Sequence, residues 1–168
     1  MLLHETFQDL ADRAEVNVKS FPSLTAEQIN AHPGGHPNSI AWLLWHAGRV
    51  LDVLGSAAAG TGQLWETQDF RSRFQLGELG DGTGVGHSVE EAAQIRVGDL
   101  DLLIEYVAAN LQAYRDYAAT LEDDAVFEEV IGEFKGAPET RQARLTLIIV
   151  DALRHIDQAL YIAGMPEL

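Results

Sequence analysis

Apolar residues recur every three to four positions along most of the chain, which is the spacing of one face of an α-helix. The last helical pattern is followed by Gly164 and then Pro166, a typical signal for the end of a helix. The chain is therefore expected to be mainly helical. The pattern predicts four amphipathic helices: residues 2–18, residues 39–54 with an extension as far as Gly60, residues 99–121, and a last helix from Pro138 or Glu139 to Gly164.

The connections between these helices differ in length and composition. Residues 21–38 contain three prolines and predict a loop. Residues 60–88 are rich in glycine and show little periodicity, and long connections of this kind in compact domains are often functional. Residues 122–134 are acidic and predict a loop or a short strand. Three aromatic residues of the glycine-rich connection are expected to fold back onto the helices: Trp65, Phe70 and Phe74.

Four long helices with two sizeable connections are typical of a helical bundle. The length of 168 residues suits one domain with its own hydrophobic core. We therefore predict an all-α fold, a four-helix bundle with long connections, in a single domain spanning residues 1–168.

The composition limits the kinds of partner and of chemistry. Asp and Glu number 26 against 11 Lys and Arg, which gives a net charge of −15. Because nucleic acids and anionic membranes are polyanions, binding to either is not expected. The sequence contains no cysteine, which excludes a disulfide scaffold, thiolate metal sites and a catalytic thiol. Any thiol chemistry would need the sulfur atom of a cofactor.

The sequence also carries no pattern that predicts export or membrane insertion. No segment reaches 18 consecutive apolar residues, so no membrane span is predicted. The first residues carry acids and lack a basic segment followed by an apolar one, which a signal peptide requires. A cytoplasmic location is the resulting expectation.

The predicted second helix carries a histidine at the border of its apolar stripe. At about 100° per residue, His46 lies roughly 40° from Val50 and roughly 60° from Leu43 around the helix axis. It therefore borders the core. A histidine at such a position is either hydrogen-bonded to a neighbour or a metal ligand.

The last helix places a carboxylate and an imidazole one turn apart. Asp151 and His155 are four residues apart, so their Cβ atoms lie about 5–6 Å from each other on one helix face. Because Ile148 and Ile162 share that face, it is at least partly buried. A buried carboxylate is unfavourable unless it is paired or coordinates a metal. The residues thus form either an ion pair, in which Arg154 could also take part, or a piece of a metal site.

Together, His46, Asp151 and His155 offer two imidazoles and one carboxylate. This donor set suits a catalytic Zn²⁺ with open positions, and it also suits Fe²⁺, Ni²⁺ or Mn²⁺. With Fe²⁺ the set would fit a non-haem iron oxygenase. Spacing alone does not choose between these metals, or between a metal and an ion pair, since Asp and His often lie four residues apart.

Two segments resemble the DinB-like four-helix-bundle superfamily. The segment HPNSIAWLLWHAGRVLD is similar to its second helix, where a histidine near the middle, here His46, is a metal ligand. The segment DALRHIDQALYIAG is similar to the fourth-helix pattern His-x-x-x-His-x-Gly-Gln. Asp151 takes the place of the first histidine, while His155 and Gln158 match the second histidine and the glutamine. Asp157 stands where the pattern has glycine.

The connecting segments LWETQDFRSRFQL and GVGHSVEEAAQIRVGD resemble the actinobacterial branch of that superfamily. This branch includes mycothiol-dependent S-transferases and relatives of the N-terminal domain of maleylpyruvate isomerase. The resemblance implies one divalent metal, Zn²⁺ or Ni²⁺ before others, held by His46, Asp151 and His155. It also implies a small-molecule thiol, mycothiol or another of low molecular weight, which the metal activates toward an electrophilic substrate. A homodimer is a further expectation.

Other residues keep more than one interpretation. Gln158 either orients His155 or makes a plain interhelical hydrogen bond. Trp65 either lines a substrate cleft or anchors the glycine-rich connection. His87 precedes a predicted helix cap at Ser88 and is interpreted as a solvent-exposed residue or as part of the capping region. The alternative function is a non-enzymatic DinB-like bundle, ligand-binding or stress-associated, in which Asp151 and His155 form a structural pair.

Overall fold

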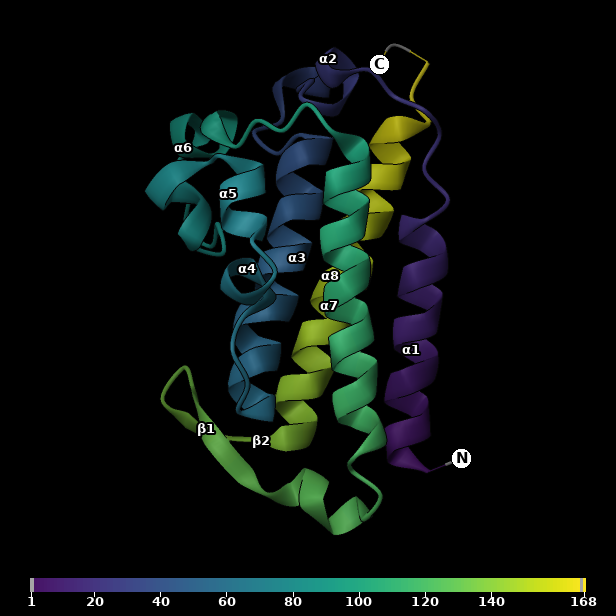
Figure 1. The fold of residues 1–168 in the computed structure, drawn as a ribbon, viewed down its shortest axis with the longest axis vertical. Coiled ribbons are helices and arrows are strands. Elements are labelled where there is room, and N and C mark those ends of the chain that lie inside the picture. Colours follow the sequence, from purple (N-terminus) through teal and green to yellow (C-terminus); the bar gives the residue numbers. More distant parts are fainter. Residues whose placement is uncertain (1, 167) are drawn as a thin grey trace.

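The structure, a computed structural model, describes residues 2–166 and 168 of the chain. Four long helices of this described part lie side by side along the longest axis of the molecule (Figure 1). Both α1 and α3 pack against α7 and α8, and the four helices share one apolar core. The prediction of a mainly helical chain is therefore confirmed. The bounds of these helices are α1 Leu3–Val18, α3 Ile40–Ala59, α7 Leu100–Ala119 and α8 Arg141–Ala163.

The helix α3 is enclosed on more than one face. Its residues are buried without interruption from Ile40 to Asp52, whereas an amphipathic surface helix buries one face only. Figure 1 shows the reason, because the connection between α3 and α7 lies against α3 on the side away from α1. The polar residues of this stretch, His46 among them, therefore need partners inside the molecule. Among the described helices, none combines the length and the apolar character needed to cross a lipid bilayer.

The connection predicted as a long loop over residues 60–88 contains short helices, so this expectation is wrong in part. Helices of a single turn give no periodic pattern, and tertiary contacts rather than propensity stabilise them. As predicted, its aromatic residues fold back: they are buried against Tyr106 of α7. The predicted cap at Ser88 is also confirmed, since its Oγ accepts a hydrogen bond from the amide of Glu91. The short elements between α3 and α7 are α4 Leu64–Thr67, α5 Phe70–Phe74, a 3₁₀ segment Gly77–Asp81 and α6 Val89–Gln94.

The first connection and the last one also contain short regular elements. Between α1 and α3 lie the short helix α2 Ala26–Ile29 and a 3₁₀ segment Pro33–Gly35. Between α7 and α8, a 3₁₀ segment Asp124–Glu128 precedes two antiparallel strands, β1 Val130–Phe134 and β2 Ala137–Thr140. Of the two predictions for residues 122–134, the short strand is the one seen at their C-terminal end.

The start of the last helix differs from the prediction. The sequence placed it at Pro138 or Glu139, but these residues belong to β2, and α8 begins at Arg141. Pro138 pairs with Glu133 across the hairpin, and Lys135 and Gly136 form the turn with positive φ angles. The capping residue is Thr140, whose Oγ accepts a hydrogen bond from the amide of Ala143. Proline is common both in edge strands and in the first helical turn, so its presence did not decide between them.

Candidate metal centre

The predicted residues His46, Asp151 and His155 come together between α3 and α8. One potential ligand atom from each lies within 4.8 Å of the other two. Nε2 of His46 is 3.4 Å from Oδ2 of Asp151, and Nε2 of His155 is 3.4 Å from its Oδ1. The two imidazole rings are nearly perpendicular, with their centres 4.6 Å apart, and the Nε2 atom of each ring faces this carboxylate.

Hydrogen bonds on the far side of each ring fix which nitrogen carries the proton. Nδ1 of His46 donates to the backbone oxygen of Thr83, and Nδ1 of His155 donates to Oε1 of Gln158 at 2.7 Å. Because a carbonyl oxygen only accepts, the proton of each neutral ring lies on Nδ1. The lone pairs on Nε2 then point toward Asp151. This is the orientation that metal-binding histidines adopt when a carbonyl group holds the other nitrogen.

The carboxylate between the rings is not satisfied by the protein alone. Oδ2 of Asp151 is buried and has no hydrogen-bond partner among the described residues. The 3.4 Å separations from the two Nε2 atoms exceed the roughly 2.7–2.9 Å of a charge-assisted hydrogen bond. With neutral rings, nitrogen lone pairs face carboxylate oxygens, and acceptors placed this way repel each other. A cation would satisfy this arrangement, either a metal ion or the protons of charged imidazoles.

The charge of Asp151 follows from its surroundings. Burial opposes ionisation and by itself raises the pKa of this carboxyl group. The hydrogen bonds and positive charge that His155 and His46 provide when protonated outweigh burial and hold the pKa of Asp151 below its ordinary range. Asp151 is therefore ionised while the two rings are protonated, and a cation bound in place of those protons would favour the same ionised form, which a metal ligand must have.

An aromatic wall lies beside the three residues. The Trp42 indole stacks on His46 with ring centres 4.6 Å apart. Its Nε1 donates a hydrogen bond to Nδ1 of His87 at 3.3 Å, and His87 in turn stacks on Trp45 at 5.7 Å. Trp42 and His87 of this wall line a cavity of about 380 Å³ together with His46, Asp151 and His155, while Trp45 lies behind them and is fully buried.

The placement of His87 corrects the interpretation from the sequence. It does precede the capped helix α6, but its ring lines the cavity and takes no part in the cap. This position was hard to predict, because His87 is 41 positions from His46 and follows a glycine-rich stretch without periodicity. The two glycines before it, Gly84 and Gly86, were the available signal: both have positive φ angles, which glycine adopts most easily.

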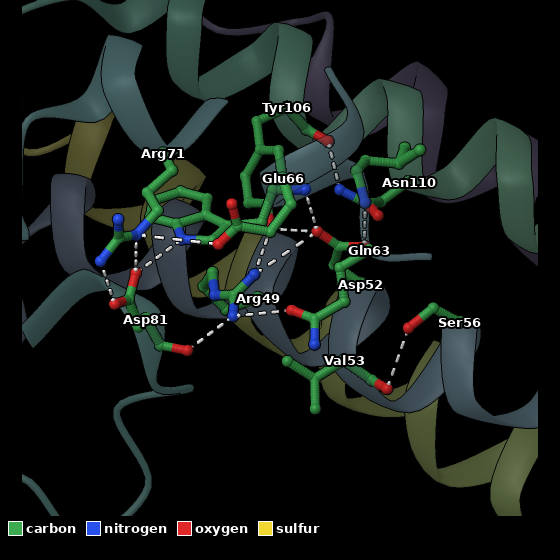
Figure 2. A network of polar contacts seen from close by, with 12 residues as sticks. Arg49, Asp52, Val53, Ser56, Gln63, Glu66, Arg71, Asp81, Tyr106 and Asn110 are labelled. Carbon is green, nitrogen blue, oxygen red and sulfur yellow. Dashed lines mark hydrogen bonds and ion pairs between the residues drawn. The ribbon is translucent and has the colours of Figure 1, made fainter. Parts of the chain in front are cut away.

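A buried polar network holds the segment that contacts His46 (Figure 2). Nε of Arg49 donates to the backbone oxygen of Gly82 at 3.0 Å, and Nη2 donates to that of Asp81 at 2.6 Å. The next backbone oxygen along the chain belongs to Thr83 and accepts the hydrogen bond of His46. Arg49, one turn after His46 on α3, thus fixes the peptide groups that precede this contact.

The carboxylate of Asp52 balances the charge of Arg49 and connects the network to two other elements (Figure 2). Both side chains are almost fully buried, and Nη1 of Arg49 lies 3.4 Å from Oδ2 of Asp52. The same carboxylate accepts hydrogen bonds from Tyr106 of α7 at 2.8 Å and from the amides of Leu64 and Trp65 at 2.7 Å. The network therefore joins α3, α7 and the start of α4.

The structure does not bring Trp65 to the cavity. Its indole is buried under the guanidinium group of Arg49, 4.6 Å from the ring centre, and packs on Phe74 and Tyr106. Of the two interpretations from the sequence, the anchor of the connection is the one observed. Gln158, in contrast, contacts His155 directly.

At the surface end of this network, Asp81 forms an ion pair with Arg71 that depends on pH. The bidentate hydrogen bonds from Arg71, and a further one from Trp65, lower the pKa of Asp81 from 3.8 to about 2. A carboxyl group whose pKa falls on folding stabilises the protein above its unfolded pKa and loses this effect as the pH drops through the folded value. The substitution Asp81→Asn should therefore lower the free energy of unfolding near pH 7 by about 1 kcal/mol, a value reduced for the exposure of the pair.

The difference between Asp81→Asn and the wild type should shrink as the pH falls from about 4 to about 2, which urea unfolding at a series of pH values can measure. The matched control is Glu133→Gln, which removes one negative charge from an exposed strand residue. A difference that stays constant down to the lowest pH would contradict the assignment of the low pKa to Asp81.

Comparison with known proteins places this geometry in a family. The family model described as the DinB superfamily matches residues 9–159, nearly the whole chain. The chain belongs to the DinB superfamily. The matched DinB region contains His46, Asp151, His155 and Gln158.

One solved structure is similar over almost its full length. It is the crystal structure of a conserved protein from Enterococcus faecalis, and the TM-score is 0.85. The two chains are 32% identical, and the similarity covers 97% of this chain and 96% of that one. No curated protein matches the chain at a significant level.

Proposed function

We propose that the protein is a DinB-type four-helix bundle that binds one divalent metal ion through His46, Asp151 and His155. The observation that carries the proposal is the carboxylate of Asp151: its Oδ2 is buried and unpartnered and faces Nε2 of His46, while its Oδ1 faces Nε2 of His155. Zn²⁺ and Ni²⁺ suit a set of two imidazoles and one carboxylate. Three protein ligands leave coordination positions open, as in catalytic rather than structural zinc sites.

We further propose that the open positions receive the thiol of a low-molecular-weight cofactor such as mycothiol, and that the protein is an S-transferase or isomerase. A divalent cation bound here would favour the ionised, nucleophilic form of such a thiol. The chain has no cysteine, so the sulfur must come from a cofactor. In transfer, the thiolate bonds to the electrophilic carbon and the displaced group leaves with its electron pair; in isomerisation, the same thiol adds and is later released.

The residues of the chain have separate parts in this proposal. Thr83 and Gln158 hold the proton on Nδ1 of the two histidines, which leaves Nε2 free to bind the metal. Trp42 covers one face of the His46 ring and reduces access of water. Asp151 supplies one negative charge, so the bound dication keeps a net positive charge toward an incoming thiolate.

The enzyme proposal can be tested apart from metal binding. Protein loaded with Zn²⁺ or Ni²⁺ is mixed with mycothiol, bacillithiol or glutathione and with 1-chloro-2,4-dinitrobenzene, a general electrophile for thiols. We expect metal-dependent formation of the thioether with at least one thiol, and loss of this activity in His46→Ala. If metal-loaded protein matches the buffer rate with every thiol and a wider panel of electrophiles, the transferase proposal fails while the metal site stands.

The alternative is a non-enzymatic DinB-like bundle in which Asp151 forms a structural ion pair. The observation that favours it is the contact of one carboxylate with two histidines, which protonated rings would satisfy without a metal. In that case Asp151→Asn would lower the melting temperature, and added Zn²⁺ or Ni²⁺ would leave the wild-type value unchanged. The metal proposal requires the opposite response to the added ions.

Gln158 provides a test of how the ligands are oriented. In Gln158→Leu, Nδ1 of His155 loses its acceptor and the ring loses its fixed orientation. Such changes typically weaken metal binding by about 10–100-fold, which titration against a chromophoric chelator measures. The control Gln158→Glu keeps an oxygen acceptor and should retain most of the affinity. Equal affinities of the Leu and Glu variants would show that this hydrogen bond does not orient a ligand.

A further inference from the structure

The third histidine of the cavity differs from the two proposed metal ligands in its protonation. The indole nitrogen of Trp42 can only donate, so Nδ1 of His87 must accept the hydrogen bond between them. The proton of the neutral His87 ring therefore lies on Nε2. His46 and His155 carry theirs on Nδ1 and present a lone pair, whereas His87 presents an N–H group. An N–H group cannot bind a metal, but it can donate a hydrogen bond.

The position of His87 is fixed on several sides. Its ring stacks on Trp45 at an angle of 15°, and its backbone amide donates to the oxygen of Gly84 at 3.1 Å. Gly84 has a φ of +84°, and a Cβ there would lie 2.7 Å from the Trp45 ring and 3.0 Å from that of Trp42. The turn that carries His87 thus lies directly on two indoles, where only glycine fits. A side chain held this firmly is preorganised for binding.

Nε2 of His87 is the polar atom of the aromatic wall that remains available. It has no hydrogen-bond partner among the described residues, and it is not among the sealed polar atoms of the structure. His87 lines the same cavity as His46, Asp151 and His155, together with apolar side chains such as Val85, Val89 and Ala92. A ligand that reaches the metal centre therefore passes apolar side chains, the amide of Asn38 and the firmly held N–H donor of His87.

We propose that His87 is a substrate-binding residue whose Nε2–H donates a hydrogen bond to a carbonyl oxygen of a molecule bound at the metal centre. This inference rests on the proposed metal-binding function. The acceptor is assigned as a neutral carbonyl rather than a carboxylate, because no Lys or Arg is among the described residues that line the cavity. The expected substrate class is an uncharged molecule with a carbonyl group close to the atom that meets the metal.

The inference can be tested by binding without catalysis. The protein is loaded with Co²⁺, whose visible bands report the metal site and whose thiolate charge-transfer band reports a bound thiol. Two probes are titrated: 2-mercaptoacetamide, which carries a neutral carbonyl next to its thiol, and ethanethiol, which has no oxygen. His87→Phe keeps an aromatic ring on Trp45 but removes the donor, and His87→Gln keeps an N–H donor in a similar place.

In His87→Phe we expect about fivefold to tenfold weaker binding of 2-mercaptoacetamide, the effect of one hydrogen bond, with unchanged affinity for ethanethiol and for Co²⁺. His87→Gln should restore part of the loss.

Equal losses for both thiols, or no loss for either, would overturn the role of His87 while the Co²⁺ bands still support the metal site. A wild-type protein without Co²⁺ bands would overturn the metal proposal, and this inference with it.

Discussion

Replacing Asp151 with asparagine is expected to weaken Zn²⁺ binding by more than about 100-fold, since loss of a direct ligand should exceed the 10–100-fold typical of outer contacts. The substitution keeps the size of the side chain but removes the only carboxylate of the cluster formed with His46 and His155. Two neutral imidazoles remain, and they neither complete the donor set nor balance the charge of a dication. Competition against a chromophoric chelator gives the affinities of both proteins.

The matched control for this prediction is Asp157→Asn, on the same helix. Asp157 is exposed and accepts a hydrogen bond from Asn17 of α1 at 2.8 Å, outside the cluster. The Asp157→Asn substitution removes the same charge from α8 as Asp151→Asn does, so a general electrostatic effect would appear in both variants. Wild-type Zn²⁺ affinity in Asp151→Asn, or equal losses in the two variants, would contradict the assignment of Asp151 as a ligand.

The second large effect is expected from Arg49→Met, which should lower the free energy of unfolding by about 3 kcal/mol or more. Methionine fills much of the same space, but Asp52 then keeps a negative charge that is 2% exposed and has lost its cation. The peptide oxygens of Asp81 and Gly82 lose their donors as well. Removing one partner of a buried pair is costly because the other charge stays uncompensated.

Urea unfolding measures this effect, with Arg13→Met as the control. Arg13 pairs with Asp9 on the exposed face of α1, so its loss should change stability little. Arg49→Met should also weaken Zn²⁺ binding, because the segment that ends in the contact of Thr83 with His46 loses its support. A stability loss no greater than that of Arg13→Met would contradict the structural role of the network.

The long helices could be predicted because their apolar residues recur at helical spacing, even in α3, where burial is continuous from Ile40 to Asp52. Asp151 and His155 could be predicted to lie together because they are one helical turn apart. His46 was added to them because its segment resembles the second helix of the DinB superfamily. Their contact across α3 and α8 is a property of helix packing, which no local pattern encodes.

Other features were beyond the sequence for physical reasons. The single-turn helices of the connection owe their stability to contacts such as those of Asp52 with the amides of Leu64 and Trp65. Pro138 suits both a strand edge and a helix start, and the hairpin partner Glu133 decides between them. His87 lies at the cavity because the turn at Gly84 packs on Trp42 and Trp45, which are about 40 positions away in the sequence.

Whether His46, Asp151 and His155 hold a divalent metal ion can be measured by metal analysis. Protein without a His-tag is purified without chelators, and its metal content is measured by plasma mass spectrometry beside that of His46→Ala. We expect nearly one equivalent of metal in the wild type, lost in a variant that remains folded. Metal-free wild-type protein whose melting temperature does not rise with added Zn²⁺, Ni²⁺, Mn²⁺ or Fe²⁺ would contradict metal binding by these residues.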